Sequence, residues 1–353
     1  MQTSNHKKTS GRIVALLLIM ALFLLGNGLL NYVFTPYRGS SGEMWMYYQK
    51  AEPEMIYTGS SQCLCGIDPE TVDDILRTSS YNMGTNMQSF RSSYVAIRAA
   101  VEEKGVRRVV LCVDDEITGL DRTDNFRADA SFQRARNANT NRLTAGRETL
   151  SFLMDEPVLM HTGSINYFFP WSYDRVTDIG QNIKEKRDKK VYDETGHRMI
   201  TGREPSEEIL EDDLTVIGYE EWEEWNQTAG DLEILSLSAD SRKELQKIAS
   251  YCQEKGVELI PITLPYPTAF RLYAPESYQK TVEELTELFS AYGVDYRNFN
   301  FAKPSFYQID LSEYKDTGHF NTKGALRFSQ VLAGYLEMSE TERSSCFYTT
   351  DDF

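Results

Sequence analysis

The feature that most constrains this chain is an uncharged run of 22 residues, Ile13–Phe34, near the amino terminus. As an α-helix rising about 1.5 Å per residue, it would be about 33 Å long, which matches the hydrocarbon core of a bilayer. Lys7, Lys8 and Arg12 precede the run, and clustered positive charge stays on the cytoplasmic side. The sequence therefore predicts a single-pass protein of the cell membrane, with everything after the run outside the cell.

A cleavable signal peptide is the alternative interpretation of the same run. Its apolar region would be shorter, however, and neither a small-residue cleavage site nor a lipobox cysteine follows Phe34. We therefore favour a permanent anchor at residues 13–34, preceded by a cytoplasmic tail at residues 1–12.

The composition is that of a folded protein, because 41% of the 353 residues are hydrophobic and 25% are charged. Acidic residues outnumber basic ones 53 to 37, which gives a formal charge of -16 and argues against a nucleic-acid partner. The five cysteines suggest no disulfide framework, since Cys112 and Cys252 lie in apolar runs. Cys63 and Cys65 lack a second pair or a nearby histidine, so we expect no metal and no cofactor.

After the apolar run, short β-type segments alternate with segments of helical periodicity, which is typical of a parallel sheet covered by helices. We expect an α/β protein with a three-layer α/β/α sandwich around a central parallel sheet. The five predicted strands are Met55–Thr58, Ser80–Met83, Val106–Val113, Val257–Leu264 and Val294–Phe299. The main predicted helices are one that begins at Asp68-Pro69, then Ser89–Lys104, Ser241–Glu254, Thr281–Tyr292 and Thr322–Leu336.

The predicted organisation is a juxtamembrane linker at residues 35–53, an α/β domain at 54–340 and a carboxyl-terminal tail at 341–353. Within the domain, the alternation breaks between about residues 122 and 232, which is too long for an ordinary loop. We expect this insertion to cap the carboxyl edge of the sheet, where α/β proteins bind ligands. Its aromatic residues could stack on sugar rings or simply bury one face of the insertion; they include Tyr167–Trp171, Tyr219, Trp222 and Trp225.

A candidate nucleophile follows the first predicted strand, in the segment Gly59-Ser60-Ser61. A serine on a tight turn at the carboxyl end of a parallel strand projects its hydroxyl into the ligand crevice, and a glycine permits the backbone bend. The triplet alone carries no information, because Gly39-Ser40-Ser41 repeats it where nothing indicates catalysis. The strand context therefore singles out the first serine pair.

A serine nucleophile needs a base, and His319 is the candidate among four histidines. His6 is predicted to be cytoplasmic, while His161 and His197 lie in the insertion. His319 is in a loop before the last predicted helix, three residues after Asp316, so that one turn could set the carboxylate against Nδ1 of the ring. An ordinary loop before a helix cap is the alternative interpretation of the same residues.

Taken together, these segments resemble the SGNH, or GDSL-like, hydrolase superfamily, whose fold is flavodoxin-like. The family's first block, Gly-Asp-Ser, is matched by Gly59-Ser60-Ser61, which puts Ser61 in the nucleophile position. The family's Asp-x-x-His block is matched by Asp316 and His319. Tyr81-Asn82-Met83-Gly84 is similar to the second block, which implies that the Gly84 amide contributes to an oxyanion hole.

The third block of the family, Gly-x-Asn-Asp, is not present after the third strand, where the chain reads Val113-Asp114-Asp115-Glu116. Its asparagine donates to the oxyanion in the family, and Asn86 is the nearest candidate to replace it. Loss of such a donor costs on the order of a hundred- to a thousandfold in rate.

The resemblance implies a cell-surface serine esterase or O-acyltransferase that acts on an acylated glycan or cell-wall polymer through Ser61, His319 and Asp316. The architecture is also similar to proteins that work beside a membrane-bound O-acyltransferase, which would then be a partner. The alternative is a catalytically silent binding or scaffolding module that partners such an enzyme, and the missing third block favours it. A serine peptidase on the same scaffold has no sequence feature of its own.

Overall fold

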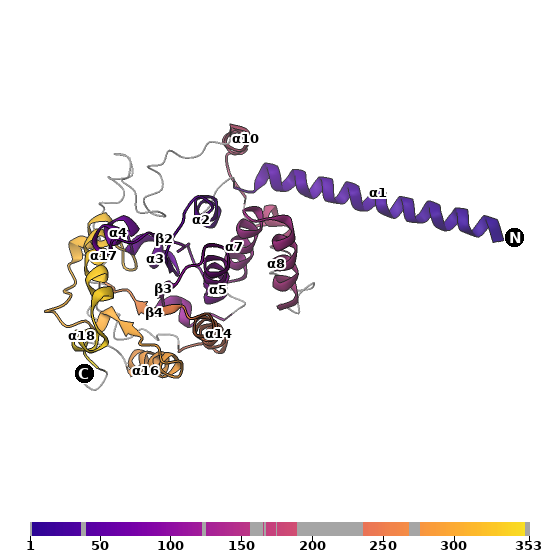
Figure 1. Ribbon diagram of the computed structural model, residues 1–353. Coiled ribbons are helices and arrows are strands. Elements are labelled where there is room, and N and C mark those ends of the chain that lie inside the picture. The colour runs from indigo at the N-terminus through magenta and orange to yellow at the C-terminus, as the bar shows by residue number, and fades with distance from the viewer. Residues whose placement is uncertain are drawn as a thin grey trace.

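One long helix, α1 (Gln2–Phe34), extends away from an α/β domain (Figure 1). Within it, Gly11–Phe34 is long and apolar enough to cross a membrane, and none of that stretch is buried in the protein. The predicted amino-terminal apolar helix is therefore confirmed. The structure is a computed structural model that describes residues 2–36, 40–121, 125–155, 165, 167–173, 175–188, 236–267 and 276–349.

The domain alternates helices and strands as the sequence predicts, and the five predicted strands all form, although most are shorter. In chain order the described elements after α1 are α2 (Ser40–Tyr48), β1 (Met55–Thr58), α3 (Ser61–Gly66), α4 (Pro69–Leu76), β2 (Ser80–Asn82), α5 (Phe90–Ala99) with a π-helical turn η1 (Ala100–Lys104), β3 (Arg108–Cys112), α6 (Asp115–Thr118), α7 (Phe126–Ala138), α8 (Arg142–Asp155), η2 (Pro170–Ser172), α10 (Ile179–Asp188), α14 (Ala239–Lys255), β4 (Glu258–Thr263), α16 (Glu276–Ser290), β5 (Arg297–Asn298), η4 (Phe299–Phe301), η5 (Leu311–Glu313), α17 (Thr322–Glu337) and α18 (Glu340–Ser345).

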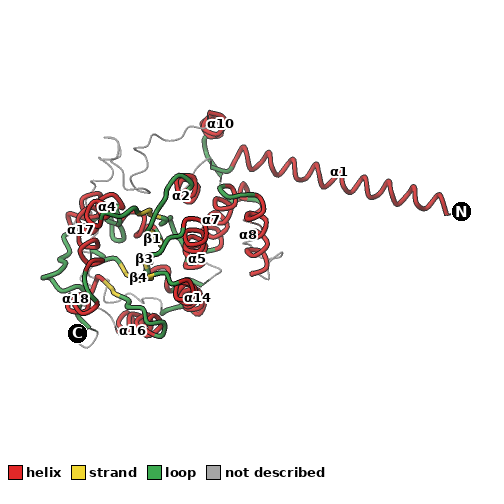
Figure 2. Tube along the Cα trace, in the orientation of Figure 1, coloured by secondary structure: helices red, strands yellow, loops and turns green. Residues whose placement is uncertain are grey.

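The strands form one parallel sheet in the order β2-β1-β3-β4-β5, so the α/β class with a central parallel sheet is confirmed. Tyr57 on β1 is in register with Val110 on β3, which is in register with Ile260 on β4. Figure 2 shows the short strands in the middle of the domain with helices around them. Because all strands run the same way, the loops that follow β1, β3 and β4 leave from one edge of the sheet.

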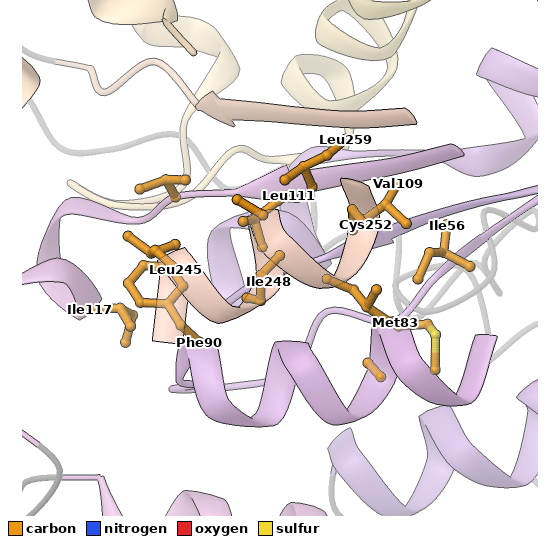
Figure 3. Close-up of a cluster of buried hydrophobic side chains, with 14 of the residues drawn as sticks. Ile56, Met83, Phe90, Val109, Leu111, Ile117, Leu245, Ile248, Cys252 and Leu259 are labelled. Atoms are coloured by element: carbon orange, nitrogen blue, oxygen red, sulfur yellow. The ribbon is translucent and has the colours of Figure 1, made fainter. Parts of the chain in front are cut away.

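Alternate strand residues pack against different helices, as expected when side chains alternate between the two faces of a strand. Val109 and Leu111 of β3 belong to a buried cluster with residues of α5 and α14, among them Leu245 and Ile248 (Figure 3). Val110 of β3 belongs instead to a second cluster that includes residues of α4 and α17. Both faces of β3 are therefore apolar, which explains why it reads as a continuous hydrophobic run.

Two segments that the sequence suggested were outside the domain pack against it. Within residues 35–53, expected as a linker, α2 buries Trp45 completely, and its ring lies 5.5 Å from that of Phe132 on α7. Within residues 341–353, expected as a tail, Phe347 is buried with its ring 5.1 Å from that of Phe299. In both segments the burial of an aromatic ring against the domain stabilises an ordered structure, which local composition does not reveal.

Much of the predicted insertion lies outside the described residues. The described parts are helical, namely α7, α8, η2 and α10, and they do not test whether residues 122–232 cap the sheet edge. His161, His197, Tyr219, Trp222 and Trp225 are outside the described residues as well.

Candidate functional site

Ser61 is the first residue of α3 and the third residue after β1 ends at Thr58. The preceding residue, Ser60, caps this helix, because its Oγ accepts a hydrogen bond from the Gln62 amide at 3.2 Å. Gly59 is needed for a steric reason, since a Cβ there would lie 2.7 Å from Cβ of Cys112 and 2.8 Å from its carbonyl oxygen. The φ angle of Gly59 is not positive, so close approach to β3, and not the backbone bend we expected, requires the glycine.

His319 lies in a tight loop between η5 and α17 that Asp316 organises. The Oδ1 atom of Asp316 accepts hydrogen bonds from the amides of Gly318 and His319, each at 2.8 Å. The same carboxylate lies against the His319 ring, with Nδ1 at 2.9 Å from Oδ1 and 3.0 Å from Oδ2. Three donors on one carboxylate fix both the loop and the orientation of the ring.

The two segments meet through a hydrogen bond between Nε2 of His319 and Oγ of Ser61, at 2.8 Å across 258 positions of sequence. This distance is within the reach of about 2.6 to 3.2 Å that proton transfer requires. Hydroxyl, imidazole and carboxylate therefore form one hydrogen-bonded series, in the order of a Ser-His-Asp triad. The His319 side chain retains 30% of its exposure and Asp316 retains 41%, so the series is accessible from solvent.

The electrostatics of Asp316 suit an ionised carboxylate. Burial raises its pKa, but the hydrogen bonds from the His319 ring and the Gly318 amide outweigh that effect, so the pKa is lower than the ordinary value. An ionised Asp316 that accepts from Nδ1–H leaves Nε2 unprotonated and able to accept the Ser61 proton.

Gln62 connects the two segments beside the triad. Its Nε2 donates to the Gly318 carbonyl at 3.3 Å, so α3 and the His319 loop share a polar contact in addition to the Ser61–His319 bond. Gln62 is buried, and a buried amide contact of this kind resists displacement of one segment from the other.

Of the two predicted oxyanion donors, Gly84 is buried and lies against α3. A Cβ at Gly84 would be 2.7 Å from the Leu64 amide nitrogen, which explains the glycine. Its N–H donates to Oδ1 of Asn82 at 2.9 Å, and the Asn82 amide in turn donates to the carbonyls of Cys63 and Ile67. Asn86 is exposed in the following loop. Their roles in an oxyanion hole stay predictions.

Asp114 was not predicted as a site residue, yet it bonds to Ser60 in the turn that precedes Ser61. The Ser60 hydroxyl donates to its Oδ2, the Glu116 amide donates to Oδ1 at 2.9 Å, and the Tyr266 hydroxyl donates to Oδ1 at 3.3 Å. Burial raises the pKa of Asp114, while these donors lower it, and the net direction is upward. The sequence feature that could have identified Asp114 as a site residue was its position two residues after β3, at the same sheet edge as Ser61.

The next residue, Asp115, is a second buried acid. Its Oδ2 accepts from the Tyr278 hydroxyl at 2.8 Å, whereas Oδ1 is buried without a hydrogen-bond partner among the described residues. Burial raises the pKa of Asp115 to about 7, and repulsion from Asp114 adds to the effect. Burial and mutual repulsion thus disfavour the state in which Asp114 and Asp115 are both ionised.

No cluster of three or more histidine, cysteine or acidic side chains that could hold a metal occurs among the described residues. No disulfide joins any of the five cysteines, all of which are among the described residues, and Cys63, Cys112 and Cys252 are buried as small apolar residues. Cys65 is half-buried, and the Lys315 ammonium lies 3.6 Å from its sulfur.

Neither a protein-family model nor a curated protein matches this chain. The geometry of the side chains at the sheet edge is therefore the basis for any functional conclusion.

Proposed function

We propose that the chain is a membrane-anchored serine esterase or O-acyltransferase of the SGNH type. The observation that carries the proposal is the hydrogen-bonded series Ser61–His319–Asp316, with 2.8 Å between Oγ and Nε2 and 2.9 Å between Nδ1 and Oδ1. Local structure does not require Ser61 and His319, 258 positions apart, to meet, because Ser60 caps α3 and Asp316 bonds to amides of the His319 loop without involving the Ser61 hydroxyl.

In the proposed reaction, Ser61 Oγ attacks the carbonyl carbon of an acyl ester while Nε2 of His319 takes the hydroxyl proton. Asp316 holds the imidazolium by accepting from Nδ1. The tetrahedral intermediate collapses as His319 returns the proton to the leaving alcohol, which forms an ester on Ser61. Water or a glycan hydroxyl, deprotonated by the same nitrogen, then takes the acyl group and frees Ser61.

An oxyanion hole would complete the site, and we assign the Gly84 amide and the Asn86 side chain to it. The Ser61 amide is a further candidate, since the first amides of a helix have no partner within the helix. The Gly84 amide bonds to Asn82 in the structure, so it would have to be shared with the substrate oxygen. Such a donor is worth about 2.7 to 4 kcal/mol in the transition state.

The rest of the proposal concerns architecture and place. We interpret the parallel sheet with its two apolar faces as the three-layer α/β/α sandwich of the SGNH fold, with residues 122–232 as an insertion. From the positive charges of Lys7, Lys8 and Arg12 before the apolar run, we propose that the amino terminus is cytoplasmic and the domain is outside the cell. The substrate class would be an acylated glycan or cell-wall polymer, and a membrane-bound O-acyltransferase would be a fitting partner.

One observation favours a second candidate, a catalytically silent module that scaffolds such an acyltransferase. The Gly84 amide is engaged by Asn82, and Asn86 is exposed in the loop beyond it, so the described residues show no oxyanion hole that is already formed. In that case the insertion would hold the partner, and the Ser61 hydroxyl would be dispensable for the cellular phenotype.

A fluorophosphonate probe, which phosphonylates activated serines, separates the two candidates. We expect the purified full chain in detergent to be labelled, and Ser61→Ala to lose the label completely because the reacting oxygen is gone. Ser41→Ala is the matched control, since Ser41 is in the second Gly-Ser-Ser triplet, and it should label like the unmodified chain. Equal labelling of Ser61→Ala and Ser41→Ala, or no labelling of the unmodified chain, would reject the enzyme and leave the scaffold.

A further inference from the structure

The outer half of α1 is covered by a segment about 145 residues later in the chain. The Phe169 ring lies 5.9 Å from the Phe23 ring, the Trp171 indole donates to Oδ1 of Asn27 at 2.8 Å, and the Val176 amide donates to the Phe34 carbonyl at 2.9 Å. These contacts advance along α1 in order, so Phe169, Trp171 and Val176 lie beside the helix from its middle to its outer end.

The last carbonyls of α1 are satisfied by the next helix, α10, which lies beside the end of α1 in Figure 1. Asn182 donates to the carbonyls of Val33 and Thr35 at 3.0 and 3.1 Å, and the Lys186 ammonium donates to the Tyr32 carbonyl at 2.7 Å. A cation at a helix carboxyl terminus opposes the helix dipole favourably. The end of α1 is therefore fixed to this part of the domain by polar contacts.

The depth of these contacts follows from the length of the apolar helix. Phe23 is about 16 Å along the axis from Phe34 and about 18 Å from Gly11, so it lies near the middle of a bilayer that Gly11–Phe34 spans. The bilayer cannot end before Phe23, because Ile13–Leu22 would be about 15 Å long and cover half of a core of about 30 Å. A side chain that touches Phe23 must therefore lie among the lipid acyl chains.

Asn27 supports the same conclusion. An unpaired carboxamide in hydrocarbon is costly, and intramembrane polar side chains face protein partners. Both ends of the Asn27 amide are satisfied by the 167–173 segment, since Oδ1 accepts from Trp171 and Nδ2 donates to the Phe168 carbonyl at 3.0 Å. These hydrogen bonds favour a segment that accompanies α1 into the bilayer.

The neighbouring surface of the domain is apolar as well. Tyr167 joins the segment to α7 and α8, because its hydroxyl accepts from Asn137 at 2.8 Å and lies 3.0 Å from the Thr149 hydroxyl. On α8 the exposed side chains Leu143, Leu150 and Met154 recur at helical spacing and form one stripe; they are 75%, 58% and 75% exposed. Figure 1 shows α8 on the side of the domain toward which α1 extends.

We propose that residues 167–173 enter the outer leaflet beside α1 and that the stripe on α8 rests on the lipid surface, so that lipid is the occupant of this apolar face. The continuity of the face with α1, and the contact that reaches the middle of the span, argue for acyl chains rather than for a protein partner. The inference rests on the proposed membrane anchor and is independent of the proposed chemistry. The domain would then lie directly on the membrane instead of moving freely on a tether.

Depth-dependent quenching tests the proposal on the full chain in nanodiscs of phosphatidylcholine brominated in the middle of its acyl chains. Trp171 emission is obtained as the difference between the unmodified chain and Trp171→Phe. We expect brominated lipid to remove about half or more of this difference signal, since the indole would lie among the acyl chains. Trp45→Phe is the control, because Trp45 is buried in the domain core and its difference signal should survive.

Added tryptophans keep the test decisive if Trp171→Phe does not fold. Leu150→Trp, at an exposed position of α8, should gain emission that lipid brominated near the headgroup quenches, whereas Glu340→Trp in α18 should gain emission that no brominated lipid quenches. Absence of quenching for both Trp171 and Leu150→Trp would overturn the proposal. Failure of the anchor itself is recognised separately, as a purified chain that lacks residues 1–34 by mass spectrometry or does not enter nanodiscs.

Discussion

At the sheet edge and at the outer end of α1, side chains from distant parts of the chain meet in different ways. Ser61, Asp114 and His319 come from loops that strand order delivers to one edge, and each is held by local contacts of its own loop before it meets the others. The Asn27 carboxamide and the Trp171 indole N–H differ, because the hydrogen bonds that they make among the described residues are with the other segment. Strand order in the sheet positions the first group of side chains. The second pair is positioned by the contact between its own two segments.

Asp316→Asn should have the largest effect. It tests whether the side chains at the sheet edge react together or only pack together. An asparagine keeps the shape but stabilises the wrong tautomer of His319, which lowers the rate about 10⁴-fold in a working triad. We expect the rate constant of fluorophosphonate labelling to fall by about 10³ to 10⁴.

Asp310→Asn is the matched control for this change. Asp310 is in the same loop region and accepts from the Ser312 amide at 2.9 Å, a role that asparagine also fills. Its labelling rate should match that of the unmodified chain. A similar loss in both variants would mean that the loop is sensitive to any change, and an undiminished rate in Asp316→Asn would remove the carboxylate from the mechanism.

Asp115→Asn is expected to have the next largest effect, on stability rather than on labelling. The pKa of about 7 in the folded chain exceeds the ordinary value of 3.8, so the folded state keeps a proton that the unfolded state has released. Stability from this group is therefore full below about pH 4 and is lost as the pH rises through 7. Asparagine should remove this dependence, worth on the order of 3 to 4 kcal/mol between pH 4 and pH 8.

The measurement is the free energy of unfolding of the full chain in detergent across that pH range. Asp74→Asn, at an exposed position of α4, should give a curve parallel to that of the unmodified chain. Parallel curves for Asp115→Asn would show that the carboxyl is hydrated and carries its charge in the folded protein.

The difference between the sheet edge and the end of α1 explains which features the sequence could predict. Strand periodicity placed Met55–Thr58 at its observed bounds. Position after a strand selected the Ser60-Ser61 pair, and the family resemblance chose Ser61 within it. His319 was selected as the histidine in the loop before the last predicted helix, three residues after Asp316. The burial of Trp45 on α2 and the pairing of Asn27 with Trp171 could not be predicted, because both depend on contacts between segments that share no strand or register. Asp114 and Asp115 were visible at the right edge, but only the surrounding side chains show that they are buried.

Gly59→Ala tests whether close contact with β3 requires a glycine in the turn between β1 and α3. The added Cβ would lie 2.7 Å from Cβ of Cys112, and overpacking of this kind costs about 1 to 3 kcal/mol. Gly334→Ala is the control of opposite sign, because nothing lies within 4 Å of its Cβ position in α17. There alanine should stabilise the chain by about 0.5 to 1 kcal/mol. Thermal unfolding of the two variants would refute the steric explanation if both shifts had the same sign.

Asn27→Leu should have the smallest effect and addresses the second region alone. It removes the hydrogen bonds with Trp171 and the Phe168 carbonyl, and such interhelical bonds in a membrane are worth about 0.6 to 2 kcal/mol. Leucine inserts into lipid more favourably than asparagine, so α1 should stay in the membrane while residues 167–173 separate from it. The expected result is faster proteolysis of that segment in nanodiscs, with fluorophosphonate labelling unchanged.

Asn31→Leu makes this last comparison quantitative, because Asn31 is one turn further along α1 and its Oδ1 is buried without a hydrogen-bond partner among the described residues. Replacing an unsatisfied oxygen with an apolar group is neutral or stabilising. Proteolysis that accelerates in Asn27→Leu and not in Asn31→Leu would assign the effect to the Trp171 pair. Equal rates in both variants would show that packing, through Phe23 and Phe169, holds the two segments together. The hydrogen bond between Asn27 and Trp171 would then only avoid the cost of a buried, unpaired amide.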